Sequence, residues 1–505
     1  MSNTLNDWLT HLESLHPKTI ALGLERVAQV KQRLNLQPDF PVIIVGGTNG
    51  KGSVCAMLEA ILHAAGYRVG CYTSPHLLDY NERVRIAKQQ ASDAELCASF
   101  ERIEQARVGP ASARLGDVGL HPQGVGRGCT GLKPQQHTHN PDLQIPLTYF
   151  EFGTLAAMQC FIAHEVDVAI LEVGLGGRLD AVNVFDADVA VVTSVDIDHV
   201  DYLGETREQI AYEKVGIFRR GRVAICADSD VPQAISQHAR EIGAELWGIG
   251  REFGFRLHQG QWDFFGQSGE RHALPLPALR GAFQLHNASA ALAALDALKD
   301  QLPVNMAAVR RGLAEVELTG RFQLVPGRPQ LILDVAHNPH AARSLAQNLA
   351  NLPPAKTFAV FAMLKDKDMA GVVAALDAQI DVWLVAGIDA PRGATAAEMA
   401  QVLERQGVRG EVVACPSIAQ ALHEASNRAG ENGDCDTLLQ SSRLRDNAVA
   451  VEAHARSALG RNQQSPDALS RTGRLRAPCR ECRIAAFGSF YTVAEVMRVR
   501  GLRSA

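Results

Sequence analysis

Residues 40–66 read FPVIIVGGTNGKGSVCAMLEAILHAAG, in which an apolar strand, Phe40–Val45, passes into an amphipathic helix, Val54–Ala65, through the glycine-rich turn GTNGKGS. Backbone N–H groups of such a turn, together with the N-terminus of the following helix, surround a phosphate group. Lys51 would reach the outer phosphate oxygens, and the Ser53 hydroxyl is placed for Mg²⁺. The stretch therefore predicts a nucleoside triphosphate site at the carboxyl end of the strand.

The turn departs in two places from the usual phosphate-loop pattern. Val45 stands where the first glycine is expected, and Gly52 separates Lys51 from Ser53. Glycine-rich turns also occur as plain connections between a strand and a helix. We favour nucleotide binding over a plain connection, because the turn has the lysine, the hydroxyl, the preceding strand and the following helix that a phosphate loop needs.

The composition is that of a globular protein. The chain has 505 residues, of which 46% are hydrophobic and 21% charged, which suffices for two or more domains. The first residues lack a basic start followed by an apolar run, and no later run approaches the length of a membrane helix. The ten cysteines follow no disulfide framework, and a net charge of −5 gives no reason to expect a nucleic-acid or membrane surface. We expect a cytoplasmic protein.

Apolar runs alternate with helical patterns along most of the chain, which predicts an α/β fold with parallel sheets covered by helices on both faces. We expect an N-terminal phosphate-loop ATPase domain with a mostly parallel sheet, residues 1–318. A smaller, Rossmann-like α/β domain follows at 319–505, with a cleft between the two. The main predicted strands after the first lie at residues 68–72, 166–172, 188–194, 222–226, 330–335, 357–361, 381–386, 411–414 and 484–487, and a helix at 285–298.

Two stretches break this alternation, at about residues 108–144 and 433–482. The first is rich in Gly, Pro, Gln and His, and the second in Arg, Ser and Gln, so both are predicted to be insertions that loop out. His137 and His139 in the first, and Cys479 with Cys482 in the second, are weak zinc candidates because neither has a second pair of ligands. Solvated disorder is a better explanation of the arginines than RNA binding.

Polar residues that follow apolar strands are site candidates, because ligands bind beyond the carboxyl ends of parallel strands. Glu172 ends one strand, where a carboxylate suits a metal ion on nucleotide phosphates, or alternatively a turn. Asp196, Asp198 and His199 follow the next strand, and this histidine is either a metal ligand or a hydrogen-bonded loop residue. Lys214, taken alone, is predicted to be an exposed helix lysine.

A series of motifs gives the chain a specific resemblance. In order they are GTNGKGS, TSPHL, ERVRI, LTYFEFGT, ILEVGLGGRLDAVN, TSVDIDHVDYLG, EKVGIF, GRFQ, DVAHNPHAA, PRGAT and GSFYTVAEV. Together they resemble the bifunctional dihydrofolate synthase/folylpolyglutamate synthases of bacteria, which belong with the Mur ligases, enzymes that form amides with ATP. The likeness covers essentially the whole chain except the two predicted insertions, which are not features of the family.

The resemblance implies a set of ligands, residue by residue. ATP and two Mg²⁺ ions are the expected cofactors, and a monovalent cation is a further candidate. Lys214 matches a lysine that is carbamylated in the family, which turns a cation into an anion able to support the second metal. The implied ATP contacts are Thr48, Asn49, Gly50, Lys51, Asn287, Arg321 and Asp334; the metal ligands are Ser74, Glu172 and His199; the catalytic residues are Lys51, Lys214 and His199. The pterin would lie along Leu22, Gly23 and Leu24, opposite Thr148, Leu179, Asp180 and Ala181.

The implied reaction adds L-glutamate to dihydropteroate and to tetrahydrofolates, in a monomer without nucleic-acid or membrane partners. Val182 replaces a small polar residue of the family pattern, and Ala21 replaces an Asp of close bacterial relatives, which bears on pterin affinity and on the balance of the two activities. Three alternatives stand beside this interpretation: a peptidoglycan Mur ligase, a nucleotide-dependent switch without ligation, and an enzyme inactivated by its insertions.

Overall fold

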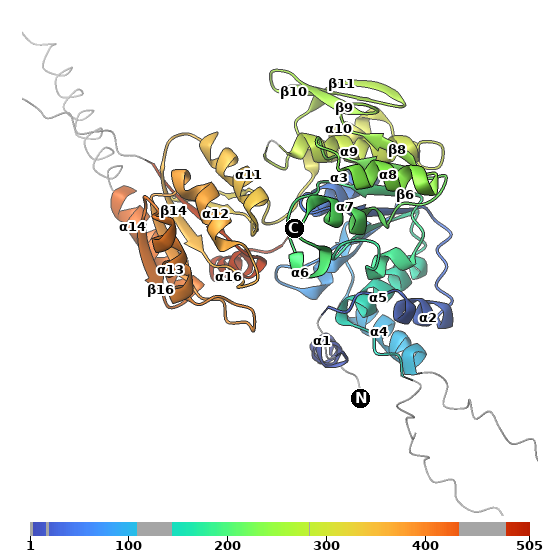
Figure 1. Ribbon diagram of the computed structural model, residues 1–505, viewed down its shortest axis with the longest axis horizontal. Helices are drawn as coiled ribbons and strands as arrows, with labels where there is room; N and C mark the ends of the chain where they lie inside the picture. Colours follow the sequence, from blue (N-terminus) through green and yellow to red (C-terminus); the bar gives the residue numbers. More distant parts are fainter. Residues whose placement is uncertain (1–3, 17–19, 109–143, 282, 434–480, 505) are drawn as a thin grey trace, which may run out of the picture. The chain divides into compact units, whose positions relative to one another are not determined.

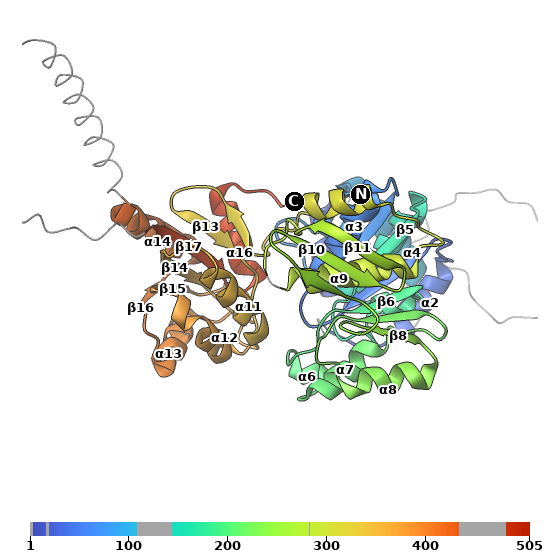
Figure 2. The same cartoon turned by 90° about the horizontal axis from the view of Figure 1, so that it is seen from above.

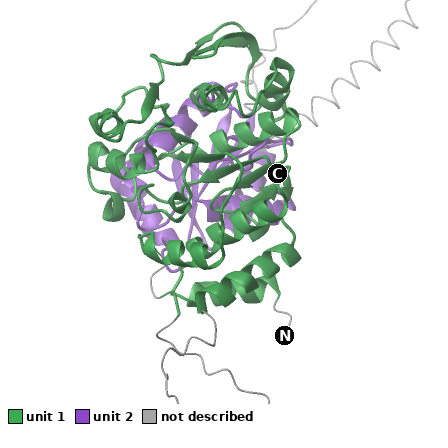
Figure 3. Ribbon diagram, turned by 90° about the vertical axis from the view of Figure 1, so that its right-hand side faces the viewer, with its two compact units in different colours: residues 1–278, 285–316 green, residues 279–284, 317–505 purple. Residues whose placement is uncertain are grey.

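The computed structural model describes residues 4–16, 20–108, 144–281, 283–433 and 481–504. These divide into two compact units, residues 1–278 with 285–316, and residues 279–284 with 317–505 (Figure 3). Each unit is built around a parallel-rich sheet with helices on it (Figures 1 and 2), so the predicted α/β class is confirmed. In the described part of the chain no helix is long and apolar enough to span a membrane.

The main sheet of unit 1 has the strand order β4-β3-β2-β5-β1-β6-β7-β8. Strand β1 lies in its middle, parallel to β5 and β6, and every residue of β1 and β5 is buried, as expected for a sheet covered on both faces. The strands are β1 (Val42–Gly46), β2 (Val69–Tyr72), β3 (Val84–Ile86), β4 (Gln89–Gln90), β5 (Val168–Glu172), β6 (Val189–Val192), β7 (Val223–Cys226) and β8 (Glu245–Gly248).

The helices of unit 1 follow the apolar patterns of the sequence, and four of them begin at capping Thr or Asn side chains: Thr4, Thr148, Thr206 and Asn305. The helices are α1 (Leu5–Ser14), α2 (Glu25–Arg33), α3 (Lys51–Ala64), α4 (Asp93–Val108), α5 (Tyr149–Ala163), α6 (Val200–Leu203), α7 (Arg207–Val215), α8 (Gln233–Ile242), α9 (Gln284–Ala297) and α10 (Met306–Glu315), with 3₁₀ turns at Tyr80–Arg83 and Ala181–Val184.

A small antiparallel sheet in unit 1 was not predicted. Its strands β9 (Gly254–Leu257), β10 (Gln261–Gly266) and β11 (Gly269–Pro275) lie next to α10 (Figure 1). Trp262 and Phe264, two residues apart on β10, are both fully buried, and this period-two pattern is the sequence signal for the sheet.

Unit 2 has a six-stranded sheet of order β12-β13-β17-β14-β15-β16, parallel except for β12. Trp383, Phe361 and Phe487 pack against one another in its core in edge-to-face and tilted arrangements, with ring centroids 5.1–6.1 Å apart. The strands are β12 (Gln323–Val325), β13 (Gln330–Leu333), β14 (Lys356–Phe361), β15 (Val382–Ala386), β16 (Glu411–Cys415) and β17 (Cys482–Phe487). The helices are α11 (Pro339–Ala350), α12 (Met369–Leu376), α13 (Ala396–Gln406), α14 (Ile418–Gly433) and α16 (Phe490–Arg500), with a 3₁₀ turn at Asp377–Gln379.

Candidate active site

The glycine-rich turn leaves β1 at the middle of the main sheet and enters α3, which begins at Lys51 rather than at the predicted Val54. Gly47 and Gly50 have φ angles of 140° and 91°, a region in which side chains are strained. A Cβ atom on Gly47 would lie 1.9 Å from Thr193 Oγ1, and one on Gly50 would lie 2.5 Å from Asn287 Oδ1. Both glycines are therefore required by conformation and by close packing.

The residues that follow β6 hold the turn in place. Ser194 O accepts a hydrogen bond from Thr48 N (2.7 Å), and Thr193 Oγ1 donates one to Asn49 O (2.6 Å). The Thr48 hydroxyl is engaged with the backbone of Asp196, from whose N–H it accepts at 3.0 Å. Lys51 Nζ donates to the carbonyl oxygens of Gly47 and Thr48, at 3.1 and 3.2 Å. The lysine charge thus lies over its own loop.

Two of the three predicted metal ligands lie together beside this loop. Glu172 is the last residue of β5, pairs in register with Val45 of β1 and is only 4% exposed. Ser74 N donates to Glu172 Oε2 at 3.1 Å, which brings the Ser74 hydroxyl to the same sheet edge. One carboxylate and one hydroxyl are the kind of set that Mg²⁺ uses when phosphate oxygens and water complete its shell. Among the described residues, no group of three or more His, Cys, Asp or Glu side chains could hold a metal by itself.

His199, the third predicted ligand, is the N-cap of α6 and has a left-handed backbone, with φ 52° and ψ 43°. Its N–H donates to Asp198 Oδ1 at 2.8 Å. A third of its side chain is exposed (32%), whereas the carboxylate of Asp198 is largely buried.

Lys214 lies in the last turn of α7 and is only 3% exposed, so the interpretation as an exposed helix lysine is wrong. Burial lowers the pKa of its amine to about 7; repulsion from Lys51 adds to the effect, and Asp198 opposes it. Burial also raises the pKa of the Asp180 carboxyl to about 7, against N–H donors from the loop and the charge of Lys51. The charge of Lys51 in the phosphate loop thus affects the pKa of both Lys214 and Asp180, and the charge of Asp198 affects the pKa of Lys214.

The residues expected to bind the pterin meet at a backbone contact. Gly23 N donates to Leu179 O at 3.3 Å, so the segment Leu22–Leu24 lies against Leu179–Ala181. Thr148 caps α5 together with Glu151, and the Arg26 guanidinium pairs with Glu151 at 2.9 Å. This ion pair links the start of α2 to the start of α5, and the sequence patterns did not identify it.

A second buried ion pair was also missed, although Glu59 is an acidic residue in an otherwise apolar stretch of α3. Its carboxylate lies 2.8 Å from Arg85 Nη2 on β3, and Arg85 Nη1 donates to Thr73 Oγ1 at 3.3 Å. Buried charges persist when they are paired, so a charge inside an apolar helix signals such a partner. The pair connects the helix of the phosphate loop to the segment that carries Ser74.

The remaining predicted ATP contacts are divided between the units. Asn287 lies on α9 in unit 1, 7% exposed, with its amide against Gly50. Arg321 and Asp334 belong to unit 2. Asp334 follows β13 and accepts hydrogen bonds from Phe322 N and Ala336 N, both at 2.8 Å, and burial raises the pKa of its carboxyl to about 6. The Arg321 guanidinium lies 5.5 Å from the centre of the Phe490 ring.

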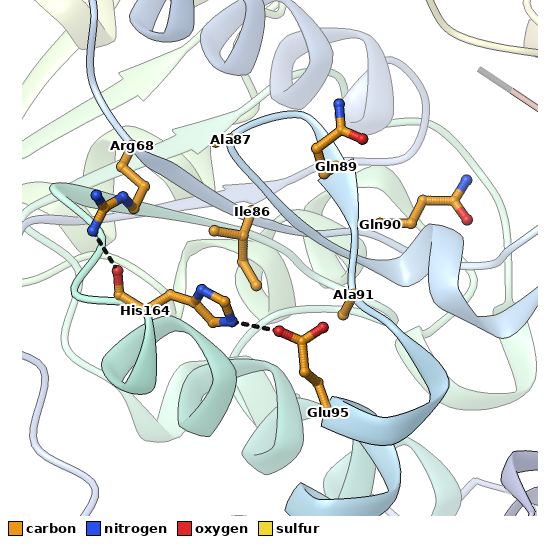
Figure 4. A pocket seen from close by; sticks show the side chains of 8 residues that line it. All are labelled: Arg68, Ile86, Ala87, Gln89, Gln90, Ala91, Glu95 and His164. Carbon is orange, nitrogen blue, oxygen red and sulfur yellow. Dashed lines mark hydrogen bonds and ion pairs between the residues drawn. The ribbon is translucent and has the colours of Figure 1, made fainter.

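One pocket lies apart from the residues described above. A pocket of about 270 Å³ is lined by Arg68, which precedes β2, and by His164 and Glu95, whose side chains are 2.6 Å apart (Figure 4). It lies at the amino end of β2, opposite the end where ligands bind in such sheets, and none of the predicted site residues lines it. Of the zinc candidates, His137, His139 and Cys479 lie outside the described residues.

Comparisons with known proteins find two family models that match parts of the chain. Residues 320–442 match the model of the Mur ligase glutamate ligase domain, and residues 123–295 that of the Mur ligase middle domain. The chain is 44% identical over 422 residues to a dihydrofolate synthase/folylpolyglutamate synthase of Escherichia coli, covering 83% of this chain and 89% of that one.

Solved structures extend this similarity to the fold. Escherichia coli FolC in complex with DHPP and ADP has 39% identity and a TM-score of 0.76, covering 99% of this chain and 98% of that one. A bifunctional folylpolyglutamate synthase/dihydrofolate synthase with Mn, AMPPNP and L-glutamate bound has 38% identity and the same TM-score of 0.76, covering 99% of both chains.

Proposed function

Because the chain belongs to the dihydrofolate synthase/folylpolyglutamate synthases of the Mur ligase family, we propose that its phosphate loop, Glu172 and Lys214 carry out the ligation characteristic of that family. The protein is an ATP-dependent ligase that joins glutamate to folates. Its acceptors are dihydropteroate, which becomes dihydrofolate, and tetrahydrofolates, which become polyglutamates. ATP and a divalent metal are its cofactors.

The chemistry follows from the two groups that are joined. A carboxylate does not react with an amine in water, so its oxygen must first become a leaving group. The γ-phosphoryl group of ATP passes to the acceptor carboxylate and gives an acyl phosphate. The amine of glutamate attacks the acyl carbon, and phosphate leaves with the pair of electrons of the C–O bond. Phosphoryl transfer spreads negative charge over oxygens, so the residues needed are those that position and neutralise.

The residues of the site supply both effects. Lys51 and the N-terminus of α3 place positive charge and N–H groups at the loop where the β- and γ-phosphates bind. Ser74 and Glu172 would hold a Mg²⁺ ion there, and that ion would neutralise charge on the transferring phosphoryl group. His199 would contribute to a second metal, and a monovalent cation is a further candidate. Asn287, Arg321 and Asp334 would contact the nucleotide.

Lys214 fits its proposed carbamylation. An amine attacks CO₂ only in its neutral form, and the product is a carbamate anion and a proton. With its pKa at about 7, about half of the Lys214 side chains are neutral at pH 7. An unperturbed lysine would be neutral in roughly one molecule in 3,000. The carbamate would replace the repulsion between Lys214 and Lys51 by attraction and would support the second metal.

The acceptor would enter from the other side of the loop. The pterin is proposed to lie along Leu22–Leu24, opposite Thr148 and Leu179–Ala181, where the Gly23–Leu179 hydrogen bond brings the two segments together. Asp180, turned inward by its bonds from Leu175 N and Val182 N, would face both the acceptor and Lys51. We further propose that the enzyme acts as a cytoplasmic monomer without nucleic-acid partners.

One observation carries the proposal: Glu172 and the phosphate loop end adjacent parallel strands, in register and at one sheet edge. The test is glutamate-dependent ADP release by Lys51→Ala and Glu172→Ala, with the exposed Lys299→Ala as the matched control. Both site variants should lose activity while their melting temperatures stay near that of the wild type, and Lys299→Ala should behave as the wild type. Near-normal turnover in either site variant would refute the assignment. Ligation of UDP-linked muropeptides in place of pteroate would favour a peptidoglycan Mur ligase instead.

A further inference from the structure

Asn183 lies in the 3₁₀ turn that follows the GLGGRLD loop and is 7% exposed. Both N–H groups of its side-chain amide donate hydrogen bonds. Asn183 Nδ2 donates to Arg178 O and to Gly216 O, both at 3.0 Å. The first carbonyl belongs to the loop after β5, and the second to the C-cap of α7. One amide group therefore connects two segments that are far apart in the sequence.

These two segments are in backbone contact around that amide. Arg178 N donates to Glu213 O of α7 at 2.7 Å, and a Cβ on Gly177 would lie 2.8 Å from Lys214 O. The loop is also the one that carries Asp180. The end of α7 that holds Lys214 is thus seated directly on the loop between Glu172 and Asp180, with no side chain between the two backbones.

Arg219, which follows the C-cap of α7 in the chain, also contacts the Asn183 amide. Its Nη2 donates to Asn183 Oδ1 at 2.9 Å, and its Nη1 donates to Gly216 O at 3.3 Å. The guanidinium fixes which way the amide points, because an oxygen must face it and the NH₂ group must face the two carbonyls. Gly216 O is one of the helix-terminal carbonyls that has no partner within its own helix, so this contact is available only at the end of α7.

We propose that Asn183 is a positioning residue. Oriented by Arg219, its amide fixes the position of Lys214 at the end of α7 relative to the loop that follows Glu172. The inference rests on the function proposed above, in which Lys214 supports a metal. The Asn183 amide donates to the carbonyls of Arg178 and Gly216, and it would act on Lys214 through these two carbonyls. Outer partners of this kind commonly change metal affinity or activity 10- to 100-fold when they are removed.

The test compares Asn183→Ala with Asn305→Ala. Asn305 caps α10 by accepting from Ala308 N at 2.9 Å, so its loss costs unit 1 a hydrogen bond remote from Lys214. Three quantities are to be measured for each variant: kcat for glutamate-dependent ADP release, the Mg²⁺ concentration that gives half of the maximal rate, and the melting temperature. Asn183→Ala should lower kcat about 10- to 100-fold and raise the half-maximal Mg²⁺ concentration about tenfold. Asn305→Ala should lower the melting temperature and leave both kinetic values unchanged.

Arg219→Met keeps the proposal testable if Asn183→Ala does not fold. It removes the group that orients the amide but leaves Asn183 in place, and it should shift the Mg²⁺ response in the same direction by a smaller factor. A folded Asn183→Ala or Arg219→Met with the wild-type Mg²⁺ response would overturn the inference, as would an equal shift in Asn305→Ala. A wild-type protein without glutamate-dependent ADP release would instead refute the proposed function.

Discussion

Gly50→Ala is the substitution for which the structure gives the most definite expectation. Gly50 caps α3 with φ 91°, and an L-residue in this region is strained by about 1–2 kcal/mol. The new Cβ would lie 2.5 Å from Asn287 Oδ1. An ordinary contact would need about 1 Å more, so either the loop or Asn287 must move by that amount. A misplacement of about 1 Å at a reacting centre costs on the order of 100-fold in rate.

Gly66→Ala separates the two effects. Gly66 follows α3 with a similar φ of 98°, but a Cβ there would have nothing within 4 Å. Both variants should therefore lose about 1–2 kcal/mol of unfolding free energy. Only Gly50→Ala should lose nucleotide binding and ligation, with kcat/KM lower by about 100-fold.

The assays are thermal unfolding for stability, calorimetric titration with ADP for binding, and glutamate-dependent ADP release for turnover. The reasoning would be refuted by wild-type kcat/KM in Gly50→Ala. It would also be refuted by an equal loss of activity in Gly66→Ala, because the defect would then come from backbone strain and not from the contact with Asn287.

Three further predictions follow from single features of the two units. If Lys214 is carbamylated, dialysis at pH 6 into CO₂-free buffer should lower activity and bicarbonate should restore it, whereas Lys214→Ala should stay inactive with bicarbonate; full activity without CO₂ would argue against the carbamate. Burial raises the pKa of the Asp334 carboxyl to about 6, above its ordinary value of 3.8, so the native protein binds more protons than the unfolded chain between these values. Its contribution to the unfolding free energy is therefore present in full below about pH 4 and lost as pH rises through 6, by roughly 3 kcal/mol at most; calorimetry at several pH values should show this slope in the wild type and not in Asp334→Asn, and parallel curves would contradict it. Removal of divalent metal with EDTA should abolish ADP release, and Mg²⁺ or Mn²⁺, but not Na⁺ alone, should restore it; activity that survives chelation would contradict the metal assignment.

Much of unit 1 could be predicted because its signals are local. The apolar run before GTNGKGS, the glycines and the helix pattern after it determine strand β1, the turn and α3 within a few residues of sequence. Glu172 could be placed for a related reason, since the carboxyl ends of parallel strands meet at one edge. Register then sets Glu172 opposite Val45.

What could not be predicted depends on contacts between distant segments. The sequence predicts Lys214 to be an exposed helix residue, because nothing in EKVGIF shows that the loop after Glu172 packs against this end of α7. The bracing of the phosphate loop by Thr193, the Arg26–Glu151 pair and the amide of Asn183 all join segments more than 30 residues apart. The sheet β9–β11 was missed although Trp262 and Phe264 lie on either side of the polar Asp263, because its strands bury only some of their residues and lack the continuous apolar runs of the parallel strands.

The most direct test of the central claim is ADP release by the full chain with ATP, Mg²⁺ and L-glutamate, with dihydropteroate and tetrahydrofolate compared as acceptors. The account predicts that release requires both glutamate and an acceptor, and that one ADP forms for each glutamate joined. ADP release that is independent of glutamate, or nucleotide binding with no ligation to either acceptor, would contradict it.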